Sequence, residues 1–223
     1  MNQKGSFSPR PFQIVYVSSA VLFLLAFCLM QPFPGRFILK AIPALSLALA
    51  FLLAQGLDGW QRWSLITGAL FCGVGDMILD IDRVRLFVPG LIAFLLGHIG
   101  FLVFFFLRRE KKSPRRVWLL PFLAFPAAMI AVLVPHLDRL LIPVLVYLTI
   151  ISLMTGFAIV SDLHIQAVLG AFAFMLSDAL LALAKFVFHG FPGPEFTVPL
   201  YFTGLFLLGF GCLKTRKSQH TPT

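Results

Sequence analysis

Two aspartates lie inside long apolar stretches, where a carboxylate is costly. Asp76 occurs in the sequence ITGALFCGVGDMIL, and Asp178 occurs in LGAFAFMLSDALLALA. A charged side chain at the middle of a membrane helix costs at least about 2.5–3.5 kcal/mol on insertion scales. Such residues usually face a protein interior or a wet cavity, and they mark a functional site. We therefore predict that Asp76 and Asp178 are the catalytic residues.

A pair of carboxyl groups in a dry site is suited to acid–base catalysis. Burial and like-charge repulsion keep one acid protonated and leave the other ionised. One neutral acid and one carboxylate together promote hydrolysis by water. The alternative is a structural role, in which each aspartate hydrogen-bonds a neighbouring helix or pairs with Lys40 or Lys185.

Five further polar residues within the apolar stretches are candidates for binding a substrate. Lys40 precedes the apolar sequence AIP, and a buried cation at this position would hold a phosphate. Lys185 lies near the end of its stretch, where it binds a ligand or extends to the membrane interface. His98 is a proton relay, a hydrogen-bonded strut or a metal ligand. Tyr147 and Tyr201 donate to a ligand or anchor the chain at the interface.

We expect no metal site and no cofactor. The other histidines fall in loops or in the tail, so the sequence does not supply the additional donors that a metal at His98 would need. The chain has no GxxxxGK[ST] phosphate loop, no CxxC pair and no GxSxG elbow. Its three cysteines lie in apolar segments and give no disulfide framework.

The composition is that of an integral membrane protein. Hydrophobic residues make up 59% of the 223 positions and charged residues only 12%, against about 25% charged residues in soluble domains. No stretch is long or polar enough to form a separate soluble domain, so we predict a single membrane domain over residues 1–223. The small-residue faces around Asp76 and Asp178 predict helices that pack closely.

The expected fold is all-α, a polytopic bundle of membrane helices. A membrane span needs about 20 mostly apolar residues. Turn residues and charges separate eight such stretches, and Asp58, Asp80, Asp82, Asp138 and Asp162 are interpreted as solvated loop charges, with a role for Asp80 left open. The predicted spans are residues 12–30, 37–55, 63–80, 86–107, 117–135, 140–160, 166–187 and 196–213.

The basic residues predict the orientation, because cytoplasmic loops carry an excess of Lys and Arg. With both termini cytoplasmic, the outer loops hold Arg36, Arg83, Arg85 and Arg139. We predict a location in a bacterial inner membrane, where the basic loops contact anionic lipids and not nucleic acid. The inner segments then hold Lys4, Arg10, Arg62, Arg108, Arg109, Lys111, Lys112, Arg115, Arg116, Lys214, Arg216 and Lys217.

The surroundings of the two aspartates indicate a parallel internal repeat. Spans 2, 3 and 4 would correspond to spans 6, 7 and 8, as two parallel repeats about an axis along the membrane normal. Chance matching in a sequence rich in Gly, Ala and Leu is the alternative. The matched pairs are Ile42-Pro43 with Ile142-Pro143, Gly68-Ala69 with Gly170-Ala171, and Val88-Pro89 with Val198-Pro199.

The chain resembles the YhhN family of membrane proteins, whose characterised members are lysoplasmalogenases. The resemblance rests on short motifs whose order and spacing extend over most of the chain. They are KAIP at 40–43, GDMIL at 75–79, GLIAFLLGHIGF at 90–101, Val146-Tyr147 with Met154, GAFAFMLSDALLALAKF at 170–186 and YFTG at 201–204.

The resemblance implies a hydrolase that cleaves the vinyl ether bond of a lysoplasmalogen, a lysophospholipid, to a fatty aldehyde and a glycerophospho-base. The aspartates implicated in that family fall on Asp76 and Asp178, and Lys40 with Tyr201 would bind the phosphate.

Two other functions fit parts of the pattern. Gly73-Val-Gly-Asp76 matches the GxGD form of intramembrane aspartyl proteases, although the second aspartate of that class lies upstream, on the preceding span. A proton-coupled transporter would also place acids and a histidine near the middle of the membrane. Proton-driven uptake without turnover of lipid would favour a transporter, whereas aldehyde release would exclude transport as the sole function.

Overall fold

The computed structural model describes residues 7–30, 33–189, 191 and 193–214. Lys4, Arg216 and Lys217 of the predicted inner basic set lie outside these residues. The chain divides into two compact units, residues 1–104 and 105–223, which are described separately. The single domain over residues 1–223 stays a prediction.

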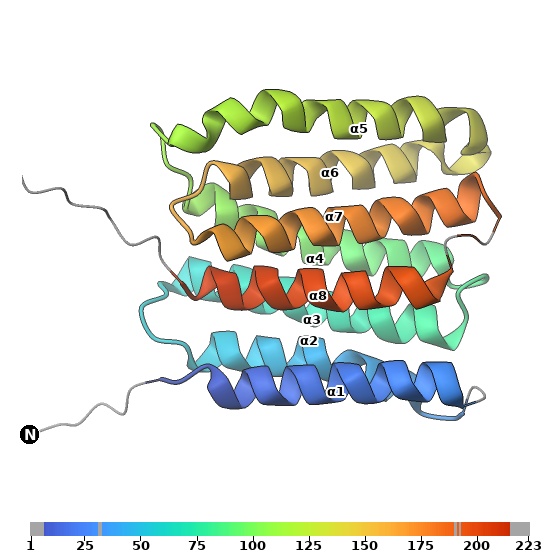
Figure 1. The fold of residues 1–223 in the computed structure, drawn as a ribbon, viewed down its shortest axis with the longest axis horizontal. Helices are drawn as coiled ribbons and strands as arrows, with labels where there is room; N and C mark the ends of the chain where they lie inside the picture. Colours follow the sequence, from blue (N-terminus) through green and yellow to red (C-terminus); the bar gives the residue numbers. More distant parts are fainter. Residues whose placement is uncertain (1–6, 31–32, 190, 192, 215–223) are drawn as a thin grey trace, which may run out of the picture. The chain divides into compact units, whose positions relative to one another are not determined.

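The all-α prediction is confirmed. Over the described ranges the structure has eight helices long and apolar enough to cross a membrane, as in an integral membrane protein (Figure 1). Their α-helical parts are α1 (Arg10–Leu29), α2 (Arg36–Leu53), α3 (Gly59–Ile81), α4 (Phe87–Leu107), α5 (Leu119–Leu133), α6 (Leu141–Ile159), α7 (Ile165–Phe186) and α8 (Pro194–Cys212). Three short 3₁₀ helices extend α5 and α6 to spans over Pro114–His136 and Asp138–Ile159. They are η1 (Pro114–Trp118), η2 (Val134–His136) and η3 (Asp138–Leu140).

Local sequence sets several helix ends. The Asp58 carboxylate accepts a hydrogen bond from the Gln61 amide at 2.7 Å and caps the start of α3. After α3, the Asp82 carboxylate accepts from the Val84 and Arg85 amides, each at 2.9 Å. The bond from the Arg85 amide is the main reason that the pKa of Asp82 lies below its usual value. Asp58 and Asp82 therefore order the two ends of α3.

In the first unit, α2 packs against both α1 and α3. Glycines bring α3 and α4 together: a Cβ atom placed on Gly100 would lie only 2.6 Å from the backbone nitrogen of Gly68. Small residues permit such close approach between helices in lipid. The close packing predicted for the helix that carries Asp76 is therefore present.

In the second unit, α7 and α8 form the most extensive helix pair, and α6 lies between α5 and α7 (Figure 1). A Cβ atom placed on Gly204 of α8 would lie 2.6 Å from the backbone nitrogen of Phe174 on α7. The helix that carries Asp178 is thus packed as closely as the helix that carries Asp76.

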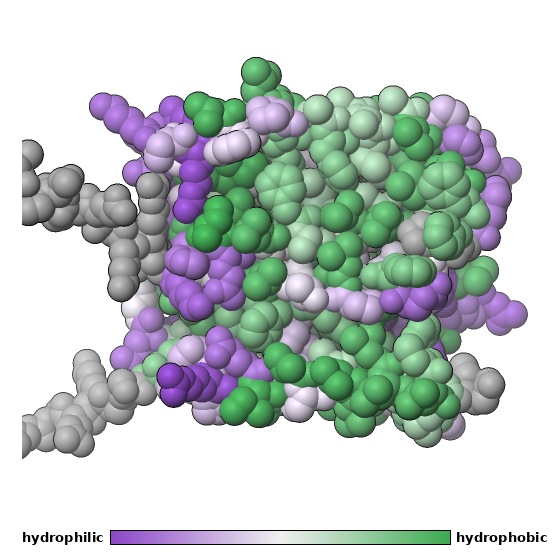
Figure 2. Space-filling model, in the orientation of Figure 1, coloured by the Kyte–Doolittle hydropathy of each residue, from purple (hydrophilic) through white to green (hydrophobic). Residues whose placement is uncertain are grey.

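Large apolar side chains are exposed along most helices, as in a protein whose solvent is lipid. Ile14, Leu120 and Ile142 are 68%, 79% and 74% exposed. Figure 2 shows hydrophobic side chains over the middle of the face it draws, with hydrophilic side chains toward the two ends. This pattern agrees with helices that cross a membrane.

Candidate functional site

Asp76 of α3 forms a buried ion pair with Lys40 of α2. The Lys40 Nζ atom lies 3.5 Å from the Asp76 Oδ1 atom, and the two side chains are only 4% and 1% exposed. Removing one partner of a buried pair leaves an uncompensated charge, which is strongly destabilising. The two residues therefore act as one unit, which is the pairing that the sequence left as an alternative for Asp76.

Small residues allow α2 to approach α3 closely enough for this pair. A Cβ atom placed on Gly73 would lie 3.5 Å from the Ala44 Cβ atom and 3.8 Å from the Ala41 carbonyl oxygen. Gly75 is more restricted, from α4, since a Cβ atom there would lie 2.6 Å from the Phe94 ring. Helix packing thus accounts for the second glycine of the GxGD match, whereas a Cβ atom on Gly73 would make only ordinary contacts.

A second ion pair lies one helical turn along the same two helices. The Arg36 guanidinium donates two hydrogen bonds to the Asp80 carboxylate, each at 3.1 Å. Arg36 precedes Lys40 by four residues on α2, and Asp80 follows Asp76 by four on α3. Asp80, left open in the sequence interpretation, therefore belongs to the charged interface of α2 and α3.

Helix α1 supplies aromatic side chains to both ion pairs. The Lys40 ammonium lies 5.9 Å from the centre of the Phe23 ring, and the Arg36 guanidinium lies 5.4 Å from the centre of the Phe27 ring. Cations at this distance from an aromatic ring are attracted by its negative face. Phe23 and Phe27 are four residues apart, so they lie on the same side of α1.

Tyr16 is a candidate site residue that the sequence analysis did not name. It is 1% exposed, and it lies within electrostatic reach of Asp76 and Cys72. A seven-residue spacing separates Tyr16 from Phe23, which places them on one side of α1. The first span holds no other tyrosine, so this spacing is the sequence signal from which Tyr16 could have been predicted.

His98 of α4 is fully buried in the first unit. Its Nδ1 atom lies 2.7 Å from the Phe94 carbonyl oxygen, four residues earlier on the same helix. A neutral imidazole that donates from Nδ1 presents Nε2 as an acceptor. The Phe94 ring packs on Gly75, directly before Asp76, so α4 covers the aspartate helix at this level.

Asp178 of α7 is hydrogen-bonded by Tyr147 of α6. The Tyr147 hydroxyl donates to the Asp178 Oδ2 atom at 2.5 Å, and both residues are half-buried. Beside this contact, the Ser177 hydroxyl donates to the Thr197 carbonyl oxygen of α8 at 2.9 Å. The position of Asp178 is thus defined by α6 through Tyr147 and by α8 through its neighbour.

The other two predicted binding residues of the second unit lie elsewhere on α7 and α8. Tyr201 is 6% exposed, and its ring packs edge-to-face on Phe174 with ring centres 5.2 Å apart. Lys185 is half-buried in the last turn of α7. The structure therefore joins Lys40 to Asp76 in the first unit and Tyr147 to Asp178 in the second.

Two loop aspartates that the sequence suggested to be merely solvated have defined partners. Asp58 caps α3, as described above. Arg108 donates two hydrogen bonds to Asp162, at 2.9 and 2.8 Å, so Asp162 is an ion-paired loop charge whose side chain is still 47% exposed. Within the described ranges, no three His, Cys, Asp or Glu side chains lie together as a metal site would require.

Comparisons with known proteins found one family model and two relatives. Residues 35–212 match the model of the YhhN family. Two relatives, from Mycobacterium bovis (strain ATCC BAA-935 / AF2122/97) and Mycobacterium tuberculosis (strain CDC 1551 / Oshkosh), are named "Lysoplasmalogenase" and are each 32% identical over 157 residues. The match covers 65% of this chain and spans 60% of the length of each relative. No solved structure matches the chain significantly.

Proposed function

The chain belongs to the YhhN family, and from this premise we propose that it is a lysoplasmalogenase-type ether hydrolase. Its substrate would be a 1-alkenyl lysophospholipid, cleaved at the vinyl ether bond to a fatty aldehyde and a glycerophospho-base. The printed name of the two mycobacterial relatives supports this activity. The single observation that carries it here is the presence of two membrane-embedded aspartates, each with a polar partner on the preceding helix.

The chemistry needs a proton donor, a carboxylate and water. An acid gives its proton to the β-carbon of the vinyl ether, and the C=C electron pair forms the new C–H bond. The resulting oxocarbenium ion is stabilised by a carboxylate and attacked by water, which loses a proton to that carboxylate. The hemiacetal then transfers its hydroxyl proton to the glycerol oxygen as the C–O bond breaks, which releases aldehyde and alcohol.

The partners of the two acids differ in charge, and we assign their roles on that basis. Asp76 is ion-paired with an ammonium group, which favours a carboxylate that stabilises the cation and orients water. Asp178 accepts a hydrogen bond from a neutral hydroxyl, and we assign it as the proton donor. Lys40 and Tyr201 remain our candidates for the phosphate, with His98, Tyr147 and Lys185 as further binding residues.

The test is aldehyde release from choline and ethanolamine 1-alkenyl lysophospholipids by the detergent-purified chain. Asp76→Asn and Asp178→Asn should each abolish release. Thermal melting measures how much of each variant stays folded, because Asp76→Asn also leaves the buried Lys40 ammonium without its carboxylate. Asp138→Asn is the matched control, because Asp138 is exposed in η3 with φ 39°, a conformation that asparagine also adopts. Full activity in either of the first two variants would contradict the proposed acid–base pair.

A further inference from the structure

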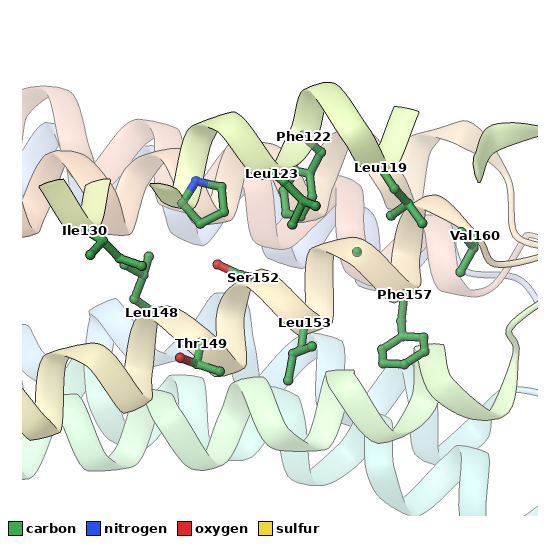
Figure 3. A pocket seen from close by; sticks show the side chains of 12 residues that line it. Leu119, Phe122, Leu123, Ile130, Leu148, Thr149, Ser152, Leu153, Phe157 and Val160 are labelled. Atoms are coloured by element: carbon green, nitrogen blue, oxygen red, sulfur yellow. The ribbon is translucent and has the colours of Figure 1, made fainter. Parts of the chain in front are cut away.

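Helix α5 leaves an apolar cavity against α6. The cavity has a volume of about 400 Å³ and is lined by apolar side chains of both helices, with Phe122, Ile130, Leu148 and Leu153 among them (Figure 3). Ser152 also lines it (Figure 3), and its Oγ atom is buried without a hydrogen-bond partner among the described residues. A pocket of this size accommodates a small-molecule ligand.

A second cavity lies on the other side of Phe122, between α5 and α7. Its volume is about 460 Å³, and Phe122, Phe125, Val168 and Phe172 are among its apolar residues. Phe122 separates the two cavities, and it packs edge-to-face on Phe172 with ring centres 5.5 Å apart. Helix α5 is therefore bordered by two apolar cavities that share one wall.

The second cavity has a charged end. Arg115 and Trp118 line it from the 3₁₀ helix η1, where residues three apart lie on the same side. The Arg115 guanidinium donates to the Leu163 carbonyl oxygen at 3.1 Å, a bond that helps to fix its position. Trp118 is 65% exposed, as is typical of a tryptophan at the level of the lipid head groups.

Backbone hydrogen bonds join the segment before η1 to the segment between α6 and α7. The Glu110 amide donates to the Val160 carbonyl at 2.9 Å, and the Asp162 amide donates to the Arg108 carbonyl at 3.1 Å. Residues 108–116 also carry a positive charge, with Arg108, Arg109, Lys111, Lys112, Arg115 and Arg116 against Glu110. Of these cations, Arg108 is paired with Asp162. This surface attracts anions and repels an ammonium head group.

The two cavities are separate from the Tyr147–Asp178 contact. On α6, Gly156 lines the first cavity and lies nine residues after Tyr147, which at about 100° per residue places it on the opposite side of the helix. On α7, Leu169 lines the second cavity and precedes Asp178 by nine residues, so Leu169 and Asp178 lie on opposite sides of α7. Both cavities thus open on the α5 side of α6 and α7, away from the candidate catalytic residue.

We propose that this part of the protein is a binding site for an anionic phospholipid with two hydrocarbon chains. The phosphate binds the Arg115 guanidinium at the level of Trp118, and one chain enters the cavity on each side of Phe122. The planar guanidinium suits a phosphate because it donates two parallel hydrogen bonds. The proposal does not depend on the proposed hydrolase activity.

The test measures lipid binding to the detergent-purified full chain by native mass spectrometry. Phosphatidylglycerol should bind more tightly than phosphatidylcholine, and Arg115→Gln should weaken its binding about tenfold. Arg116→Gln is the matched control, because Arg116 is exposed in the same helix and does not line either cavity. Equal losses in the two variants, or equal binding of the two lipids, would overturn a specific anionic site.

A second variant tests the two-chain arrangement. A Cβ atom on Gly156 would lie 3.8 Å from Phe122 and 3.9 Å from Leu119, so a side chain can be added without a backbone clash. Gly156→Leu should fill the α5–α6 cavity and weaken phosphatidylglycerol binding about fivefold, while lysophosphatidylglycerol binding stays unchanged. Unchanged binding of both lipids would show that the α5–α6 cavity does not hold a chain.

Discussion

The Lys40 ammonium lies 3.5 Å from the Asp76 carboxylate, and both side chains are almost completely buried. One turn along the same helices, Arg36 pairs with Asp80 in the same cation-to-carboxylate order. Phe23 and Phe27 of α1 lie beside the two cations. Three helices thus contribute to one charged layer around Asp76.

Breaking the Lys40–Asp76 pair should destabilise the protein. Lys40→Met leaves the Asp76 carboxylate buried without its cation, at a cost of about 3–5 kcal/mol. The double variant Lys40→Met/Asp76→Asn removes both charges and should recover most of the lost stability. Thermal melting of the purified variants measures both effects. A double variant no more stable than Lys40→Met would contradict a direct pairing.

The Tyr147 hydroxyl should matter for activity more than for folding. Tyr147→Phe removes one hydrogen bond to a carboxyl group. This should cost less than the roughly 1.5–3 kcal/mol of a bond to an ionised group, because we assign Asp178 as the neutral acid. We expect aldehyde release to fall about tenfold, chiefly in kcat, with a small change in melting temperature. Thr149→Val is the control, since the exposed Thr149 hydroxyl donates to the Leu145 carbonyl oxygen of its own helix. An equal loss of activity in both variants would contradict a specific role for Tyr147.

The sequence predicts the helices better than it predicts the contacts between them. Hydropathy, turn residues and charge predict the eight helices, because these signals are local to each segment. The acids were also predictable, since Asp76 and Asp178 are anomalous in apolar surroundings. The sequence did not decide the partner of Asp76, because Lys40 lies on another helix. Whether the Lys40 ammonium contacts a carboxylate or a phosphate depends on how the two helices pack. Tyr16 was missed because one aromatic residue in an apolar span is not anomalous.

The internal repeat stays a prediction, and the structure adds two parallels to it. In each unit the helix before the aspartate supplies its partner, Lys40 in one and Tyr147 in the other. In each unit the helix after the aspartate packs closely through glycines. The partners are not at matched positions, because Lys40 precedes Pro43 whereas Tyr147 follows Pro143. A repeat would therefore share the arrangement of the helices and not the residues that contact the two aspartates.

Tyr16 should be a positioning residue for Asp76. The family match begins at residue 35, so α1 lies outside it, yet Tyr16 is buried within electrostatic reach of the aspartate. Tyr16→Phe should lower kcat about fivefold to tenfold, leave KM unchanged and shift the pH profile of aldehyde release. Ser18→Ala, at an exposed hydroxyl that bonds the Val15 carbonyl of α1, should change neither. A loss of stability with an unchanged pH profile would indicate only a structural role.

Glycines at helix contacts should respond to substitution according to the space around them. Gly204→Ala places a Cβ atom 2.6 Å from the Phe174 backbone nitrogen, so α8 must move away from α7. We expect a loss of about 1–3 kcal/mol or more, since overpacking in a tight contact costs at least this much. Gly156→Ala, with its nearest neighbours 3.8 and 3.9 Å away, should be neutral or slightly stabilising. Equal melting temperatures for the two variants would contradict the close α7–α8 contact.

Ser152→Ala should stabilise the protein. The Ser152 Oγ atom is buried at the α5–α6 cavity and has no hydrogen-bond partner among the described residues. A buried hydroxyl without a partner costs about 1–3 kcal/mol, and alanine removes that cost while it leaves the helix intact. The control is Thr155→Ala, which removes a buried hydroxyl that bonds the Ile151 carbonyl at 2.9 Å and should not stabilise. A lower melting temperature for Ser152→Ala would mean that the hydroxyl has a partner in the membrane, such as a bound water or lipid oxygen.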